Sequence, residues 1–109
     1  MSRTVVNLIK KIERQRGRGA EVAVGIALDE MARDGEIVSF YKTGRHADKF
    51  QGIDFFVIKI SGEKIPLQVK SSQTSVLNHW KKFPNVPAIV VKTGDDAKTI
   101  KTKIWSALE

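Results

Sequence analysis

Apolar residues recur at helical spacing in two segments near the N-terminus. The first predicts a helix near residues 3–15, and the second predicts a helix over residues 20–31 that ends at Gly35. Gly17 and Gly19 lie between the two segments, and each costs about 1 kcal/mol relative to alanine in a helix interior. The pattern leaves open whether these segments form one interrupted helix or two. The apolar positions are Val5, Val6, Ile9 and Ile12, followed by Ala20, Ala23, Val24, Ala27, Leu28 and Met31.

Three strands are predicted in the middle of the chain. Residues 36–41 have the pattern of a short strand, and residues 53–60 and 65–70 are rich in β-branched and aromatic side chains that favour strands. The compact turn 61–64 joins the last two strands into a hairpin. The intervening residues 43–52 are predicted to form a loop.

A helix, a strand and a second helix complete the chain. An apolar side that includes Val76 and Leu77 predicts a helix over residues 72–83, and the run 88–91 predicts a buried strand. The last helix is expected to start at Asp95–Asp96, because acidic residues favour a helix N-terminus, and to run to Leu108. In these helices we expect Trp80 and Trp105 to pack in the core and His79 to be exposed.

The predicted order of elements is therefore α-β-β-β-α-β-α. Three consecutive strands are expected to pair antiparallel, whereas the helix before the fourth strand allows a parallel crossover. The expected fold is α/β, with a mixed central sheet flanked by helices on both faces. With 109 residues, the chain has room for one domain spanning residues 1–109.

Composition excludes several classes of site. The chain has no cysteine, which excludes disulfide scaffolds, thiol catalysis and Cys-ligated zinc. Its two histidines, His46 and His79, are isolated in the sequence, so a histidine-rich metal site is not expected. No apolar run approaches the roughly 18 residues that span a bilayer, and the N-terminus lacks the pattern of a signal peptide. We expect a cytoplasmic protein with no membrane partner.

The positive charge is concentrated at the N-terminus. The formal net charge is +7, of which residues 1–18 contribute +5 through six basic residues and one acid. Such clustering is typical of a polyanion-binding surface, although a solvated helix face gives the same pattern. The expected phosphate-binding residues are Lys10, Lys11, Arg14, Arg16 and Arg18, with Arg45 and Lys49 on the predicted loop.

Candidate chemistry lies on the predicted hairpin. Gln68 and Lys70 are two residues apart on one strand and therefore share a face, about 7 Å apart. A turn centred at Gly62–Glu63 would place Asp54 of the partner strand opposite Ser71 and diagonal to Gln68. The alternative is that Asp54 simply begins a strand and that Gln68 and Lys70 line a solvated sheet face.

A carboxylate and an amide oxygen suit a hard cation such as Mg²⁺, with Mn²⁺ as a substitute. Lys70 beside such an ion could stabilise charge on a reacting phosphate or position a water. Glu21 borders the apolar stripe of its helix and could reach the sheet, although a partly exposed flank residue is an equal alternative.

These residues resemble the motifs of the PD-(D/E)XK nuclease superfamily, and most closely its Holliday-junction-resolvase-like members. The resemblance covers roughly residues 17–92 and rests on Arg18-Gly19-Ala20-Glu21, Gly52-Ile53-Asp54 and Gln68-Val69-Lys70. It implies a restriction-endonuclease-like α-β-β-β-α-β core and a Mg²⁺-dependent endonuclease. Carried over by motif, Asp54 and Gln68 would bind the metal, Glu21 would complete the site, and Lys70 would orient the nucleophile. Gln73 corresponds to a polar residue that faces the cleft in some members.

The sequence departs from the motif at Gln68, where the superfamily usually has an acid. The leading hypothesis is a metal-dependent endonuclease acting on DNA rather than RNA, including branched DNA. Symmetric cutting of a junction would require a homodimer. The alternatives are a catalytically inactive, nuclease-like nucleic-acid-binding module, for which Gln68 is the best support, and a purely structural domain.

Overall fold

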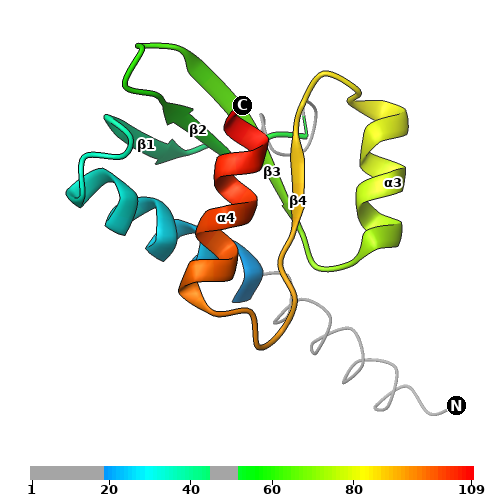
Figure 1. Ribbon diagram of the computed structural model, residues 1–109. Helices are drawn as coiled ribbons and strands as arrows, with labels where there is room; N and C mark the ends of the chain where they lie inside the picture. The colour runs from blue at the N-terminus through cyan, green and yellow to red at the C-terminus, as the bar shows by residue number, and fades with distance from the viewer. Residues whose placement is uncertain (1–18, 45–51) are drawn as a thin grey trace, which may run out of the picture.

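The computed structural model describes residues 19–44 and 52–109. Over these ranges the fold is α/β, with a four-stranded mixed sheet and three helices (Figure 1). The general fold class is therefore confirmed. The helix predicted near residues 3–15 lies outside the described residues, as do the basic residues Lys10, Lys11, Arg14, Arg16, Arg18, Arg45 and Lys49.

The strands are β1 (Ser39–Lys42), β2 (Phe55–Ile58), β3 (Lys64–Lys70) and β4 (Ala88–Val90), and they lie side by side in the order β1-β2-β3-β4. β1 pairs antiparallel with β2, and β2 pairs antiparallel with β3. β3 and β4 are parallel, as expected when a helix connects them. In this topology the C-terminal end of β1, the N-terminal end of β2 and the C-terminal ends of β3 and β4 lie next to one another, at one end of the strands.

The helices comprise residues 19–33, α3 (Gln73–Lys82) and α4 (Ala97–Leu108). Ser72 and Asp96 are the N-caps of α3 and α4, and each side chain accepts a hydrogen bond from the backbone N–H three residues later. The predicted starts of both helices are therefore correct to within two residues.

The main core lies between one face of the sheet and two helices, the helix of residues 19–33 and α4. Leu67 and Val69 of β3 point into this core, so the alternation of a strand directs Gln68 and Lys70 to the opposite face. α3 covers that opposite face. The fully buried core members include Val24, Leu28, Met31, Val57, Leu67 and Ile104.

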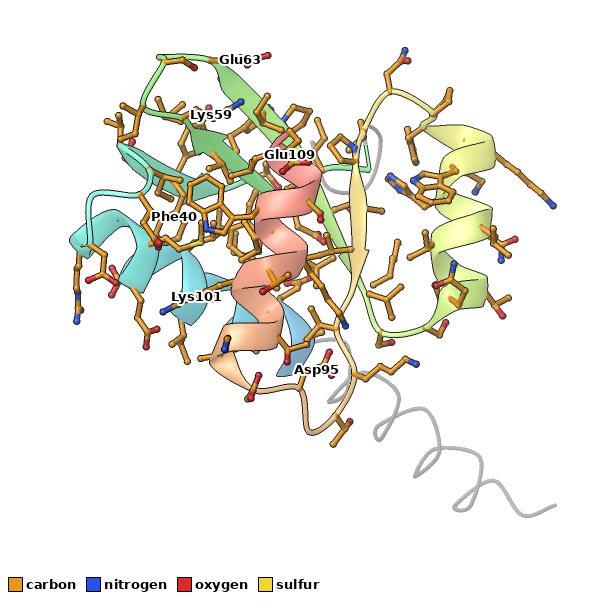
Figure 2. The ribbon with its side chains drawn as sticks, in the orientation of Figure 1. Phe40, Lys59, Glu63, Asp95, Lys101 and Glu109 are labelled. Atoms are coloured by element: carbon orange, nitrogen blue, oxygen red, sulfur yellow. The ribbon has the colours of Figure 1, made fainter. Side chains whose placement is uncertain are left out.

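Two lysines bind α4 to its neighbours (Figure 2). Lys101 forms an ion pair with Glu30 of the helix of residues 19–33, with 2.7 Å between nitrogen and oxygen. Lys59 donates to the carbonyl of Leu108 at 2.9 Å and lies 3.6 Å from Glu63. Because the last carbonyls of a helix have no intrahelical donor, Lys59 satisfies one of them. No helix among residues 19–44 and 52–109 is long and apolar enough to cross a membrane.

The predicted core positions of both tryptophans are wrong, and so is the predicted exposure of His79. Trp80 is 45% exposed and Trp105 is 39% exposed, whereas His79 is only 4% exposed. α3 rests on the sheet through Val76 and His79, one turn apart, and this turns Trp80 outward. On α4, Ile104 already occupies the core-facing stripe, so the next residue, Trp105, is rotated away by about 100°.

Replacing Ile104 with alanine is expected to lower the free energy of unfolding by about 2–5 kcal/mol, because it removes a fully buried side chain from the core. Trp105→Ala, one residue away, is expected to cost less because much of the indole is already exposed. Urea denaturation of both variants checks this ranking. A larger loss for Trp105→Ala would contradict the observed orientation of α4.

Candidate functional site

The β2–β3 hairpin has a different register from the one predicted. Phe55 pairs with Leu67 and Ile58 pairs with Lys64, whereas the sequence predicted Asp54 opposite Ser71. The turn is earlier than expected because Lys59 forms the closing backbone hydrogen bonds. Its N–H donates to Glu63, and its carbonyl accepts from Gly62. Gly62 has a φ of +89°, the left-handed conformation that the last residue of a three-residue hairpin loop requires.

Asp54 lies at an irregularity where β2 begins. Its N–H donates to the carbonyl of Leu67 at 2.9 Å, although Leu67 is already the register partner of Phe55. Two residues opposite one is the arrangement of a β-bulge, which redirects side chains. The carboxylate of Asp54 turns toward β3, where Oδ2 accepts from the N–H of Val69 at 2.8 Å. The structure therefore places buried Asp54 beside the segment Gln68–Lys70.

Gln68 and Lys70 line a cleft of about 340 Å³ together with residues of α3. We call it the α3 cleft. Gln68 is 5% exposed, and Lys70 is half-buried. These two residues share one face of β3, as predicted. The alternative of an open, solvated face does not hold for Gln68, because α3 covers it. The polar lining is Gln68 and Lys70 from β3 and Ser75, Asn78, His79 and Lys82 from α3.

The side-chain oxygen of Gln68 has no hydrogen-bond partner among the described residues, although it is buried. An unsatisfied buried acceptor costs about 1–3 kcal/mol relative to one that is paired. Such a group in a folded protein calls for an explanation, and a bound ligand is one of the recognised ones. The amide oxygen is therefore available to a cation or to a donor beyond the described residues.

Glu21 lies at the same end of the strands as Asp54, where β1 ends. Its carboxylate forms an ion pair with Lys42 at the end of β1, with 3.1 Å between Oε2 and Nζ. The start of its helix borders a hollow of about 580 Å³ that is also lined by Ser71 and Ser72, which directly follow Lys70. The side chain of Glu21 is 27% exposed, so it is mostly covered and engaged by Lys42.

Gly52 allows the backbone before Asp54 to lie close to the end of α3. Gly52 has a φ of +65°, and a side chain there would collide with the ring of Phe83 at the end of α3. Both residues border the α3 cleft, and Phe83 also contacts the ring of His79, with 5.4 Å between centroids. The backbone before Asp54 therefore approaches α3 as closely as only glycine permits.

His79 forms the floor of the α3 cleft as a neutral imidazole. Burial lowers its pKa below the ordinary value of 6.5, a hydrogen bond between Nε2 and the carbonyl of Val86 acts in the opposite direction, and the charge of Lys70 lowers it further. Because Nε2 lies 3.1 Å from a carbonyl, it carries the proton. This role could not be predicted from the sequence, since it depends on how α3 is rotated about its axis.

The residues present fit a hard cation in their chemistry. Asp54 offers carboxylate oxygens and Gln68 offers an unpartnered amide oxygen, both suited to Mg²⁺ or Mn²⁺. Within the described ranges, no group of three or more His, Cys, Asp or Glu residues could hold a metal ion. The candidate set therefore depends on the amide of Gln68. Gln73, the first residue of α3, is exposed and lines a different hollow, between α3 and α4.

No protein-family model, curated protein or solved structure matches this chain.

The lowered pKa of His79 predicts a pH dependence of stability. Below about pH 6.5 the unfolded chain binds a proton at this position more readily than the folded chain, so stability is full above that pH and falls as pH decreases. His79→Gln keeps a donor for Val86 and is expected to reduce the difference between urea midpoints at pH 5.5 and pH 7.5.

The control is His46→Gln, which replaces the only other histidine. A wild-type pH dependence in His79→Gln, with a reduced one in His46→Gln, would contradict the burial of a neutral His79.

Proposed function

We propose that this protein is a metal-dependent endonuclease that hydrolyses phosphodiester bonds in DNA. The observation that carries the proposal is the buried oxygen of Gln68, which has no hydrogen-bond partner among the described residues, on the strand whose next residue, Val69, holds the carboxylate of Asp54. Lys70 shares the strand face of Gln68. Metal-ligating oxygens beside an ammonium group are the components that phosphodiester hydrolysis requires.

Asp54 and Gln68 would hold the ion, and Glu21 would contribute a carboxylate by exchanging its partner Lys42 for the metal. When bound, Mg²⁺ would supply Lewis acidity toward the phosphate and lower the pKa of water. The bulge that directs Asp54 to β3 fixes this carboxylate in place, because Val69 holds one of its oxygens. The site therefore has a preorganised acid and an amide oxygen with no competing partner in residues 19–44 and 52–109.

Lys70 would act on the substrate. Lys70 is half-buried at the end of β3, where a positive charge is less screened than at the surface. There it would attract the scissile phosphate and stabilise the negative charge that develops as water adds to phosphorus. The bond from phosphorus to the leaving oxygen would then break. The attacking water would give up one proton to solvent, and the leaving oxygen would take up one.

The topology and the charge support the same proposal. The chain order of the described elements, a helix followed by β1, β2, β3, α3 and β4, agrees with the α-β-β-β-α-β order that the resemblance to PD-(D/E)XK nucleases implies. The basic N-terminus would bind nucleic-acid phosphates without reading sequence. Cutting of branched DNA at two symmetric positions would require two copies of the chain.

A second candidate function is nucleic-acid binding without cleavage. Gln68 favours it, because an amide contributes no negative charge to the site, where the motif usually has an acid. Salt-sensitive DNA binding without Mg²⁺-dependent cleavage would establish this alternative.

Asp54→Asn is expected to lower the rate of Mg²⁺-dependent cleavage by more than about 100-fold, since even the outer partners of metal ligands cost 10- to 100-fold. Cleavage of supercoiled, linear and four-way-junction DNA in Mg²⁺ or Mn²⁺ measures this. Asp34→Asn, at an exposed acid, is the control and should match the wild type. Equal activity of wild type and Asp54→Asn, or no cleavage by either, would refute the proposal.

Gln68→Glu is expected to lower the Mg²⁺ concentration for half-maximal cleavage by about tenfold, which corresponds to about 1.4 kcal/mol. The substitution adds a negative charge where the amide oxygen now lies. Gln73→Glu adds the same charge at an exposed position of α3 and should leave the requirement unchanged. If both variants respond alike, Gln68 does not contact the ion.

A further inference from the structure

The α3 cleft contains positive charge that the metal site does not use. Lys82 lines it from the last turn of α3, opposite Lys70 on β3. No acidic side chain occurs among the described residues that line the cleft, and neither lysine forms an ion pair within the described ranges. By contrast, Lys42, Lys59, Lys101 and Lys103 all have carboxylate partners. No carboxylate of the described residues therefore neutralises the charge in the α3 cleft, which leaves it available to an anion.

The other groups in the cleft are suited to a phosphate. Ser75 and Asn78 follow one another along the cleft-facing side of α3, three residues apart, and each carries a hydrogen-bond donor. The volume of about 340 Å³ is at the lower end of the range for ligand pockets and accommodates one phosphate with part of its sugar. The hydrogen bond of His79 Nε2 to the carbonyl of Val86 engages this nitrogen within the protein, so the lysines carry the charge of the cleft.

We propose that the α3 cleft binds a backbone phosphate of the nucleic-acid strand, adjacent to the phosphate that is cut. Lys82 pairs with this phosphate, and Ser75 and Asn78 donate hydrogen bonds to it. The inference rests on the nucleic-acid substrate proposed above and adds a contact surface on α3 that the sequence interpretation did not include. Lys70, which would act on the phosphate that is cut, also lines the α3 cleft, so we place the two phosphates on one strand.

The chain offers a matched pair of lysines for the test. Lys81 and Lys82 are neighbours in the last turn of α3, and both are exposed, but only Lys82 lines the cleft. Both contribute equally to net charge and to the interaction with the helix C-terminus. Any difference between Lys81→Gln and Lys82→Gln therefore reports the position of the side chain rather than its charge.

The experiment measures binding of a fluorescently labelled DNA duplex by anisotropy in EDTA, where no cleavage occurs. Lys82→Gln is expected to weaken binding about five- to tenfold and to reduce the slope of log K against log salt by about 1. Asn78→Ala should weaken binding about threefold, whereas Lys81→Gln should stay within twofold of the wild type. Thermal unfolding of each variant verifies that the fold is intact.

Equal effects of Lys81→Gln and Lys82→Gln, no effect of either, or absence of DNA binding by the wild type would overturn the inference. A selective effect of Lys82→Gln supports it even if the wild type cleaves nothing, in which case only the endonuclease proposal fails. Inorganic phosphate as a competitor separates a site for any phosphate from one that requires the polymer. Displacement of DNA by low millimolar phosphate would overturn the assignment to a nucleic-acid backbone.

Discussion

The candidate site depends on one hydrogen bond, from the N–H of Val69 to the carboxylate of Asp54. At this point the β2–β3 ladder ends in a bulge, and a side-chain oxygen of Asp54 takes the place of the next backbone carbonyl. The bond satisfies a donor that would otherwise be buried without a partner, and it also fixes the carboxylate against β3. The same hydrogen bond therefore stabilises the end of the hairpin and positions the carboxylate of Asp54. Everything that we infer for Gln68 and Lys70 follows from where this contact places Asp54.

Gln68 is the opposite case, a polar group that the fold buries without satisfying it. α3 covers this face of β3, and its residues His79 and Val76 are directed elsewhere, to the carbonyl of Val86 and to the sheet. Natural proteins commonly keep energetically unfavourable groups, such as a buried acceptor without a hydrogen bond, at functional sites. An amide oxygen there binds a cation less strongly than a carboxylate would, but it also avoids a second buried negative charge beside Asp54.

Much of the fold could be predicted from the sequence, because strand and helix periods are local properties. The register of the hairpin could not, because it depends on which residue closes the turn, and the loop that ends at Gly62 is shorter than the one expected. Side-chain orientation on α3 was also beyond a periodicity argument. Trp80 is apolar and His79 is polar, yet the polar face of β3 and the carbonyl of Val86 select the reverse burial. The same orientation of α3 about its axis places Lys82 at the α3 cleft.

The central claim is that Asp54 and Gln68 together bind a divalent cation. A crystal structure of the wild-type protein with Mn²⁺, using the anomalous signal of the metal, tests it most directly. The account predicts a metal peak bonded to a carboxylate oxygen of Asp54 and to the side-chain oxygen of Gln68, with Lys70 beside it. A structure at high Mn²⁺ with no peak there, and with the Gln68 oxygen bonded to a donor of the protein or to an isolated water, would contradict it.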